Sequence, residues 1–223
     1  MKPLFILVLI FIIIGNSFSL DEDLFLINMI FKNADNNKDL VIYKNDAFID
    51  KMYLRTKYII KYDEFSRIKD IWEYNLDKYN KKVFYTFYKY VDNICVEYKI
   101  EIENPVTWKK KNVQKYILNK NFDITKYISD NIEDAVEIVR YEYSKKGKLN
   151  KIYLINYDEI EFNYENNNIL KYISRQTTNS IEKFIIGYDK SGRIRNIYKN
   201  VNVRIEYFGE KEIIRTCYTI DYP

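Results

Sequence analysis

The stretch that decides the fold is Ile185-Ile186-Gly187-Tyr188-Asp189-Lys190-Ser191-Gly192-Arg193-Ile194-Arg195-Asn196-Ile197. Apolar residues stand on both sides of a short polar segment that begins with Asp189 and ends with Gly192. An Asp side chain can accept hydrogen bonds from backbone N–H groups two residues further on, which starts a turn. Glycine adopts positive φ without a Cβ clash, as the residue that closes such a turn must. The stretch therefore predicts two antiparallel strands joined by a tight turn.

Two other segments, Tyr62 to Ile71 and Tyr143 to Ile152, have the same pattern. Its elements are Tyr, a short turn-former, two free positions, Gly or Ser, a cation, Ile or Leu, two free positions and Ile. Ser66 stands at the glycine position of the first copy, so we expect a less stable turn there. The copies begin at 62, 143 and 188, so their spacing does not predict a solenoid with a fixed period.

This pattern resembles the YD repeats of Rhs-type and teneurin-type secreted proteins, in which a Tyr-Asp-x-x-Gly-Arg-Leu/Ile motif marks successive β-hairpins. The resemblance covers about three ten-residue windows, with weaker echoes at 164–169 and 207–209. In that family many copies build a large closed shell, which a chain of 223 residues cannot form. The resemblance implies hairpins here, and it does not transfer a function.

Two-residue alternation is clearest at Ile94, Val96, Tyr98, Ile100 and Ile102, which alternate with charged residues. We expect this apolar face to lie on a core and the charged face in water. In the C-terminal half we expect strands near 136–144, 148–157, 159–164, 168–175, 181–189, 193–199, 201–208 and 211–221. The predicted fold class is mainly β with some α (α+β). The architecture is an antiparallel β-meander in a strongly curved sheet or open barrel, with an N-terminal helical segment and a helical insertion.

The first 19 residues have the pattern of a secretory signal peptide. Lys2 precedes an apolar run from Leu4 to Ile14, and small residues follow at 17 and 19. This run is shorter than the ~18 residues that a membrane-spanning helix requires. An uncleaved anchor is the competing interpretation. We therefore expect an exported protein that is periplasmic, at the cell surface or secreted.

Residues 20–54 predict a helix–loop–helix segment that precedes the β domain, 55–223. Its loop, 35–46, has Asp35, Asn37, Asp39 and Asp46 at the first, third, fifth and twelfth positions of an EF-hand. We therefore consider calcium as a candidate ion. Leu40 stands where the loop needs glycine, and positive φ is costly for a bulky residue. The alternative is a plain connection without an ion, since Asn and Asp are ordinary turn-formers.

A helical insertion is expected around 105–135. Asn104 can cap a helix, Pro105 suits its first turn, and the pattern from Val106 to Leu118 is compatible with a helix. The same region contains Trp108 and the run Lys109-Lys110-Lys111, which could touch a polyanion or form a solvated helix face.

Composition excludes several classes of function. The formal net charge of +4 on 223 residues gives no electrostatic case for nucleic acid as a partner. The chain has no His, which removes Ser-His-Asp and Cys-His catalysis and His-based metal sites. Tyrosine is abundant, with 23 residues, and aromatic residues favour pleated, half-buried surfaces.

Two carboxylate pairs and two cysteines are the remaining candidates for chemistry. Glu101/Glu103 and Glu159/Glu161 are pairs at i,i+2, so each pair shares one strand face. A glycosidase needs two carboxyl groups roughly 5–9 Å apart across a sugar, and a solvated strand face is the alternative. Cys95 and Cys217 are the only cysteines, and in an oxidising compartment they could form a disulfide. Two unpaired thiols are the alternative.

These observations favour an exported, non-enzymatic β-rich protein that binds a glycan, protein or lipid at the cell envelope. An outer-membrane β-barrel and a periplasmic carrier of a hydrophobic ligand are two alternatives. A carboxylate-based glycan hydrolase is the enzymatic alternative.

Overall fold

The computed structural model describes residues 22–33, 39–48, 51–75, 83–104, 107–128, 135–155, 158–165, 169–177, 180–205 and 209–223. The expected signal peptide lies outside these ranges. One helix and fifteen strands follow one another along the described chain. They are α2 (Glu22–Asn33), β1 (Leu40–Phe48), β2 (Lys51–Tyr62), β3 (Ile68–Asn75), β4 (Val83–Val91), β5 (Ile94–Asn104), β6 (Thr107–Leu118), β7 (Ile124–Ile128), β8 (Val136–Glu137), β9 (Val139–Tyr143), β10 (Leu149–Leu154), β11 (Glu159–Glu165), β12 (Ile169–Gln176), β13 (Ser180–Tyr188), β14 (Ile194–Ile205) and β15 (Gly209–Asp221).

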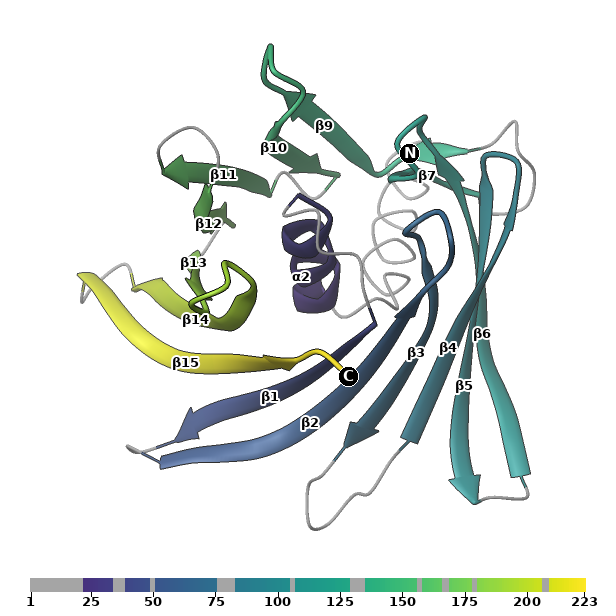
Figure 1. Ribbon diagram of the computed structural model, residues 1–223, viewed down its shortest axis with the longest axis horizontal. Coiled ribbons are helices and arrows are strands. Elements are labelled where there is room, and N and C mark those ends of the chain that lie inside the picture. The colour runs from purple at the N-terminus through teal and green to yellow at the C-terminus, as the bar shows by residue number, and fades with distance from the viewer. Residues whose placement is uncertain are drawn as a thin grey trace, which may run out of the picture.

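The strands form one antiparallel sheet in which nearly every strand pairs with its neighbours in sequence. Its order is β8-β7-β6-β5-β4-β3-β2-β1-β15-β14-β13-β12-β11-β10-β9. The first and last strands of the chain are therefore central neighbours, with Val41 opposite Asp221. The two ends of the sheet, β8 and β9, are consecutive in sequence. The sheet curls round until these ends meet, which gives the barrel-like shape in Figure 1.

Residue 138 joins the two ends of the sheet. The Ile138 N–H donates to the Thr125 carbonyl at 2.9 Å, and its carbonyl accepts from the Ile155 N–H at 3.0 Å. The Tyr141 hydroxyl adds a bond to the Ile124 carbonyl at 2.8 Å. Residues 136–143 thus contact β7 with their first part and β10 with their second. The barrel closes there because one segment satisfies backbone groups on both sides.

Helix α2 lies inside the curl of the sheet (Figure 1). Its apolar side chains point in several directions and are nearly all buried, because the sheet surrounds the helix. They are Phe25, Leu26, Ile27, Met29, Ile30 and Phe31. They belong to one core with inward-facing residues of the strands, such as Ile42, Ile152 and Ile197. At about 1.5–3 kcal/mol for each buried apolar side chain, the helix contributes on the order of 10 kcal/mol of hydrophobic stabilisation.

The turn predicted between β13 and β14 has the expected hydrogen bonds. Backbone bonds join the Asp189 N–H to the Arg193 carbonyl at 2.8 Å and the Gly192 N–H to the Asp189 carbonyl at 3.0 Å. Asp189 Oδ1 accepts from the N–H groups of Ser191 and Arg193. Hydrogen bonds from the Ser191 hydroxyl and these N–H groups lower the pKa of Asp189 to about 2. Gly192 has a φ of 79°.

The other two copies form the same turn, and a fourth copy was not predicted. Ser66 and Gly147 occupy the closing position at φ 60° and 78°. In the fourth turn, between β6 and β7, the Asn119 N–H donates to the Asp123 carbonyl at 2.9 Å. Phe122 closes this turn at φ 60°. The sequence pattern missed it because Leu118 replaces the tyrosine and Phe122 replaces the glycine.

Tyrosine hydroxyls hold the start of the strand that follows each of these four turns, and also the start of β12. Each hydroxyl donates to the carbonyl of the first or second residue of such a strand, at 2.7–2.9 Å. The pairs are Tyr90–Ile68, Tyr141–Ile124, Tyr164–Leu149, Tyr188–Leu170 and Tyr222–Ile194. The abundance of tyrosine therefore has a structural use at this end of the barrel.

The N-terminal segment corrects the prediction of a helix–loop–helix over 20–54. Its first helix is present as α2, but residues 40–48 form strand β1 and residues 51–62 form β2. Val41, Ile42 and Tyr43 favour extended backbone, and β1 has pairing partners on both sides, β2 and β15. The β domain therefore begins at residue 40, and not at 55.

The helical insertion predicted around 105–135 is also wrong where the structure describes it. Residues 107–118 form strand β6, and 124–128 form β7. Strand β6 pairs with β5 along its length, with register shifts near Lys99 and Ile102. Long-range pairing with β5 thus overrides the local helical pattern of this segment.

Candidate functional site

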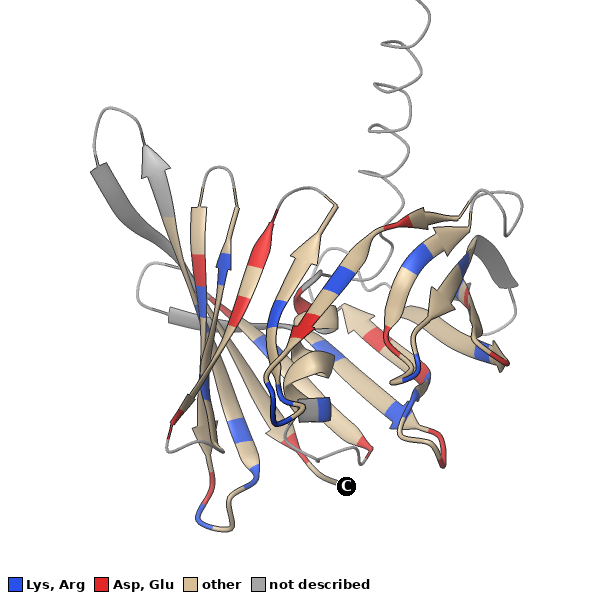
Figure 2. Cartoon of the chain, turned by 90° about the horizontal axis from the view of Figure 1, so that it is seen from above, with Lys and Arg blue, Asp and Glu red and all other residues tan. Residues whose placement is uncertain are grey.

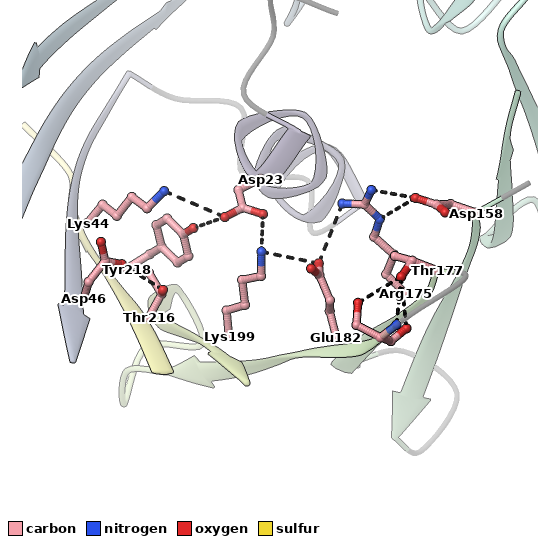
Figure 3. A network of polar contacts seen from close by, with 11 residues as sticks. Asp23, Lys44, Asp46, Asp158, Arg175, Thr177, Glu182, Lys199, Thr216 and Tyr218 are labelled. Atoms are coloured by element: carbon pink, nitrogen blue, oxygen red, sulfur yellow. Dashed lines mark hydrogen bonds and ion pairs between the residues drawn. The ribbon is translucent and has the colours of Figure 1, made fainter. Parts of the chain in front are cut away.

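A row of charged side chains, which we call the charged row, lies inside the barrel and consists of Asp158, Arg175, Glu182, Lys199, Asp23 and Lys44. Asp23 is the second residue of α2. Lys199 Nζ of β14 lies 2.8 Å from Asp23 Oδ1, and the Tyr218 hydroxyl of β15 donates to Oδ2 at 2.5 Å. Lys44 Nζ of β1 lies 3.9 Å from Oδ2. A carboxylate at this place also suits the positive end of the helix dipole. Figure 3 shows these three side chains converging on Asp23.

The row continues across β13 and β12. Lys199 Nζ lies 3.3 Å from Glu182 Oε2, and this same oxygen lies 3.6 Å from an Arg175 guanidinium nitrogen. Arg175 and Glu182 are directly opposite each other in the sheet. Arg175 also donates from Nε and from Nη2 to Asp158 Oδ2, at 3.0 and 2.6 Å. The charges therefore alternate in sign from Asp158 to Lys44 (Figure 3).

The environment favours the charged forms of Asp23 and Lys199. Burial pushes the pKa of Asp23 up, but the charge and hydrogen bond of Lys199, with smaller effects of Tyr218 and Lys44, hold it below its ordinary value. Burial pushes the pKa of Lys199 down, whereas Asp23 and Glu182 raise it above its ordinary value. Both pKa values therefore move away from neutral pH, so neither Asp23 nor Lys199 is a poised acid or base there. The chemistry of the charged row is that of an anchor between α2 and the wall.

Strands β3 to β6 form one wall of the barrel. Within it, β5 faces the opposite way from the prediction. Cys95, Glu97 and Glu101 are buried, whereas Tyr98 and Ile100 of the alternate face are half-buried on the outside. Lys99 Nζ of the inner face lies 4.0 Å from Glu73. The expectation of an apolar face on the core and a charged face in water is therefore wrong for this strand. Alternation defines two faces, but it does not specify which of them points inward.

Aromatic rings form a ladder on the outer face of this wall. Trp72 lies 4.5 Å from Tyr85 and Phe87 lies 4.6 Å from Tyr98, centroid to centroid across neighbouring strands. Tyr74 extends the ladder within β3, at 6.3 Å from Trp72. The planes of Phe87 and Tyr98 differ by only 6°, so these two rings cover each other's faces. A sugar needs an exposed ring face, so this ladder favours packing over glycan stacking.

The predicted calcium ligands are not brought together where the structure describes them. Asp35 and Asn37 lie outside the described residues. Asp39 precedes β1 and accepts from the Tyr62 N–H, and Asp46 lies near the other end of β1 and accepts from the Thr216 hydroxyl. Seven residues of extended strand separate them by roughly 20 Å. Within the described ranges, no three Cys, Asp or Glu side chains group together in a way that could hold a metal ion.

The predicted disulfide is absent. Cys95 and Cys217 are both free thiols, the first buried and the second half-buried. Their strands, β5 and β15, are separated in the sheet by β4, β3, β2 and β1. At about 4.8 Å between neighbouring strands, this separation is too large for a disulfide. Burial raises the pKa of the Cys95 thiol to about 12.

The structure places the two predicted carboxylate pairs on distant strands and on opposite faces of the sheet where it describes them. Glu101 is buried on the inner face of β5, and the Glu103 side chain lies outside the described residues. Glu159 and Glu161 lie on the outer face of β11, where Glu159 pairs with Lys151. Strands β5 and β11 lie on opposite sides of the break between β8 and β9. Side chains 108–111 are likewise outside the described part, and their backbone belongs to β6.

A small cavity lies between α2 and the turns at one end of the barrel. Its volume is about 70 Å³, and its lining includes Met29, Tyr88, Tyr90, Cys95 and Leu118. Sites for drug-sized ligands have volumes of about 300–1,000 Å³. A shallower and more open surface depression of about 380 Å³ lies beside Tyr62 and Lys69. The side chains of α2 thus occupy the space in which a carrier would hold its ligand.

Sequence reasoning missed the inner charged row because none of its members belongs to a motif. Arg175, Glu182 and Lys199 meet across the neighbouring strands β12, β13 and β14, whereas Asp23 is 176 residues from Lys199 and meets it only when α2 lies inside the sheet. The signal that was available is parity. Lys199 stands between Ile197 and Val201 at inward positions, and Glu182 stands two residues before Phe184. A charge within an apolar series of period two marks a polar contact on the inner face.

The fold and site define a closed antiparallel meander filled by a helix. No protein-family model matches the chain, and no curated protein matches it. Among solved structures, it is similar to a porin-like protein from Bacteroides uniformis, with a TM-score of 0.44 and 12% identity. The match covers 81% of this chain and 97% of that one. A likeness of this size carries no argument about this chain. In the described part, no helix is both long enough and apolar enough to cross a membrane.

Proposed function

We propose that this chain is an exported, non-enzymatic barrel protein of the cell envelope that acts through its outer surface. The observation that carries the proposal is the filled interior, since α2 occupies the space enclosed by the sheet. The inner row from Asp158 to Lys44 pairs its charges and fixes the start of the helix. Neither an enclosed ligand nor a reaction centre is needed to explain these residues.

Two of the alternatives have less support. A carrier of a hydrophobic ligand needs a cavity several times larger than the 70 Å³ beside α2. A glycan hydrolase needs two carboxyl groups about 5–9 Å apart around a sugar. Of the predicted pairs, Glu101/Glu103 has one side chain outside the described residues, and in Glu159/Glu161 the first carboxylate is paired with Lys151 on the outer face. We further propose that the turns at 63–67, 144–148 and 189–193 are degenerate YD-type hairpins, supported by their shared hydrogen bonds.

An outer-membrane β-barrel is the second candidate, and the wall of β3 to β6 favours it. That wall has aromatic residues outside and charged residues inside, as strands in contact with lipid have. The opposite wall has charges outside, including the Lys151–Glu159 pair and Glu161. Figure 2 shows residues of both signs along the strands. A lysine on a lipid face costs about 2–4 kcal/mol at the bilayer centre, so peripheral attachment is the leading proposal.

Fractionation of cells that produce the full chain with a C-terminal tag tests the proposal. We expect the mature chain, beginning near Leu20, in the envelope fraction. A wash with high salt or alkaline carbonate should release it without detergent. A requirement for detergent would favour the spanning barrel, whereas recovery from the cytosol as the uncleaved chain would refute the proposal.

A further inference from the structure

Several turns with exposed apolar side chains lie at one end of the barrel, which we name the turn end. It consists of residues 63–67, 91–93, 119–123, 143–148, 169 and 189–193, and the meander places them together because alternate turns share an end. Phe65 and Val91 are 58% and 64% exposed. Phe122 and Ile169 are 42% and 55% exposed. Four exposed large apolar side chains at the connections of one end are an unusual concentration for a surface in water.

Arg67 holds two of these side chains in place. Its guanidinium carbon lies 4.9 Å from the centre of the Phe65 ring and 5.1 Å from that of Phe122. The Tyr90 ring lies on the same guanidinium at 4.1 Å, and Asp63 Oδ2 accepts from Arg67 Nε at 2.7 Å. The turns β2–β3 and β6–β7 therefore meet over one cation, although β4 and β5 separate them in the sheet. The two phenylalanines are thus preorganised while their edges remain in water.

The remaining charge of the turn end is positive. Three of its carboxylates are already paired: Asp63 with Arg67, Asp123 with Lys32 and Asp189 with Arg193. The other carboxylates of these turns are Glu64 and Asp92, and both are exposed. Against these stand the cations Lys120, Lys145, Lys146 and Lys190. The turn end thus combines exposed apolar side chains with an excess of lysine. It complements a surface that has negative charges on the outside and an apolar layer beneath them.

We propose that the turn end contacts the surface of a bilayer of anionic phospholipids. Phe65, Val91, Phe122 and Ile169 enter the interfacial region, while the lysines lie at the level of the lipid phosphates. This inference rests on the proposed attachment to the envelope and identifies the attaching surface. In the turns at 63–67, 119–123, 144–148 and 189–193 the backbone keeps its hydrogen bonds in that position, because each of these four turns bonds to its own Asp, Asn or Ser.

Co-sedimentation with vesicles tests the inference, using the chain that begins at Leu20, which contains every described helix and strand. We expect binding to phosphatidylglycerol/phosphatidylethanolamine vesicles that weakens as salt rises. Binding to phosphatidylcholine vesicles should be at least tenfold weaker. The pair Lys145→Gln and Lys146→Gln should weaken binding roughly 30-fold, at about 1 kcal/mol for each lysine. Phe65→Ser should weaken it about tenfold.

Matched variants on the outer face of β13, Lys183→Gln and Ile181→Ser, remove one charge and one exposed apolar group away from the turn end. They should bind as the parent does. Equal binding to neutral and anionic vesicles, or equal loss in the β13 variants, would overturn the inference. The inference would also be overturned if the parent chain did not bind anionic vesicles, a result that can be obtained without any variant. If the parent is found in the envelope fraction of cells but ignores vesicles, only this inference fails. If it is absent from that fraction, the proposed function fails.

Discussion

Replacement of Gly192 by alanine tests whether the repeated turn depends on its left-handed residue. Gly192 has a φ of 79°, and a Cβ added there would meet no atom within 4 Å. Any destabilisation must therefore come from the backbone and not from a clash. The left-handed region costs an L-residue about 1–2 kcal/mol, and the stiffer unfolded chain returns about 0.4–1 kcal/mol. We expect a net loss of about 1 kcal/mol in the free energy of unfolding.

Gly187 provides the matched control in the same hairpin. It is not among the positive-φ residues, and an added Cβ would lie 3.6 Å from the Asn196 carbonyl oxygen, an ordinary contact. Gly187→Ala should therefore be neutral or stabilise by up to about 1 kcal/mol. Ser66→Gly, at φ 60°, should act in the opposite direction to Gly192→Ala and stabilise by about 0.5 kcal/mol or more.

Urea unfolding measured by circular dichroism gives the three values from the shift in midpoint at a common slope. The reasoning is refuted if Gly192→Ala and Gly187→Ala change the free energy of unfolding equally. It is also refuted if Gly192→Ala is neutral.

Three further predictions concern the charged row, the turn carboxylate and the thiols. Asp23→Ala should destabilise by about 3 kcal/mol, and a double-mutant cycle with Lys199→Met should give a coupling of about 1 kcal/mol or more; additive effects would contradict the pairing. The carboxyl carbon of Asp189 should titrate by NMR near pH 2. Because this folded-state pKa lies below the ordinary value of 3.8, the contribution of Asp189 is complete above about pH 4 and is lost as pH falls through 2; a midpoint near 4 would exclude the turn hydrogen bonds. A thiol reagent should modify Cys217 in the native protein and Cys95 only after urea is added. If neither cysteine reacts in urea until a reductant is added, the two are joined in a disulfide and the prediction is wrong.

The sequence predicted the meander and the turns because their determinants are local. Asp189 and Gly192 set the conformation of four or five residues, and the structure has the corresponding hydrogen bonds. The copy closed by Phe122 was missed because the local rule excludes a bulky residue at positive φ. In the structure Phe122 has this unfavourable backbone conformation, and its ring contacts the Arg67 guanidinium. Tertiary packing thus decided a position at which local preference predicted the opposite.

The parts that could not be predicted depend on closure of the barrel. The alternation in β5 was recognised, but the choice of inward face depends on which neighbours surround the strand. Most of β1 was predicted as the loop of a helix–loop–helix, and β6 was predicted as a helix. The hydrogen bonds that make extended backbone favourable there come from the partners β15 and β5, which a local pattern does not reveal. The contact between Asp23 and Lys199 joins residues 176 positions apart, and no local pattern reports it.

Amide hydrogen exchange of α2 tests the central claim, that the helix fills the barrel. Residues 25–31 of the helix are almost completely enclosed by the sheet, so their amides can exchange only when the barrel opens. The account predicts that a peptide covering these residues exchanges as slowly as the most protected strands, such as β14. Exchange within seconds, as fast as in the turns at 144–148 or 189–193, would contradict it.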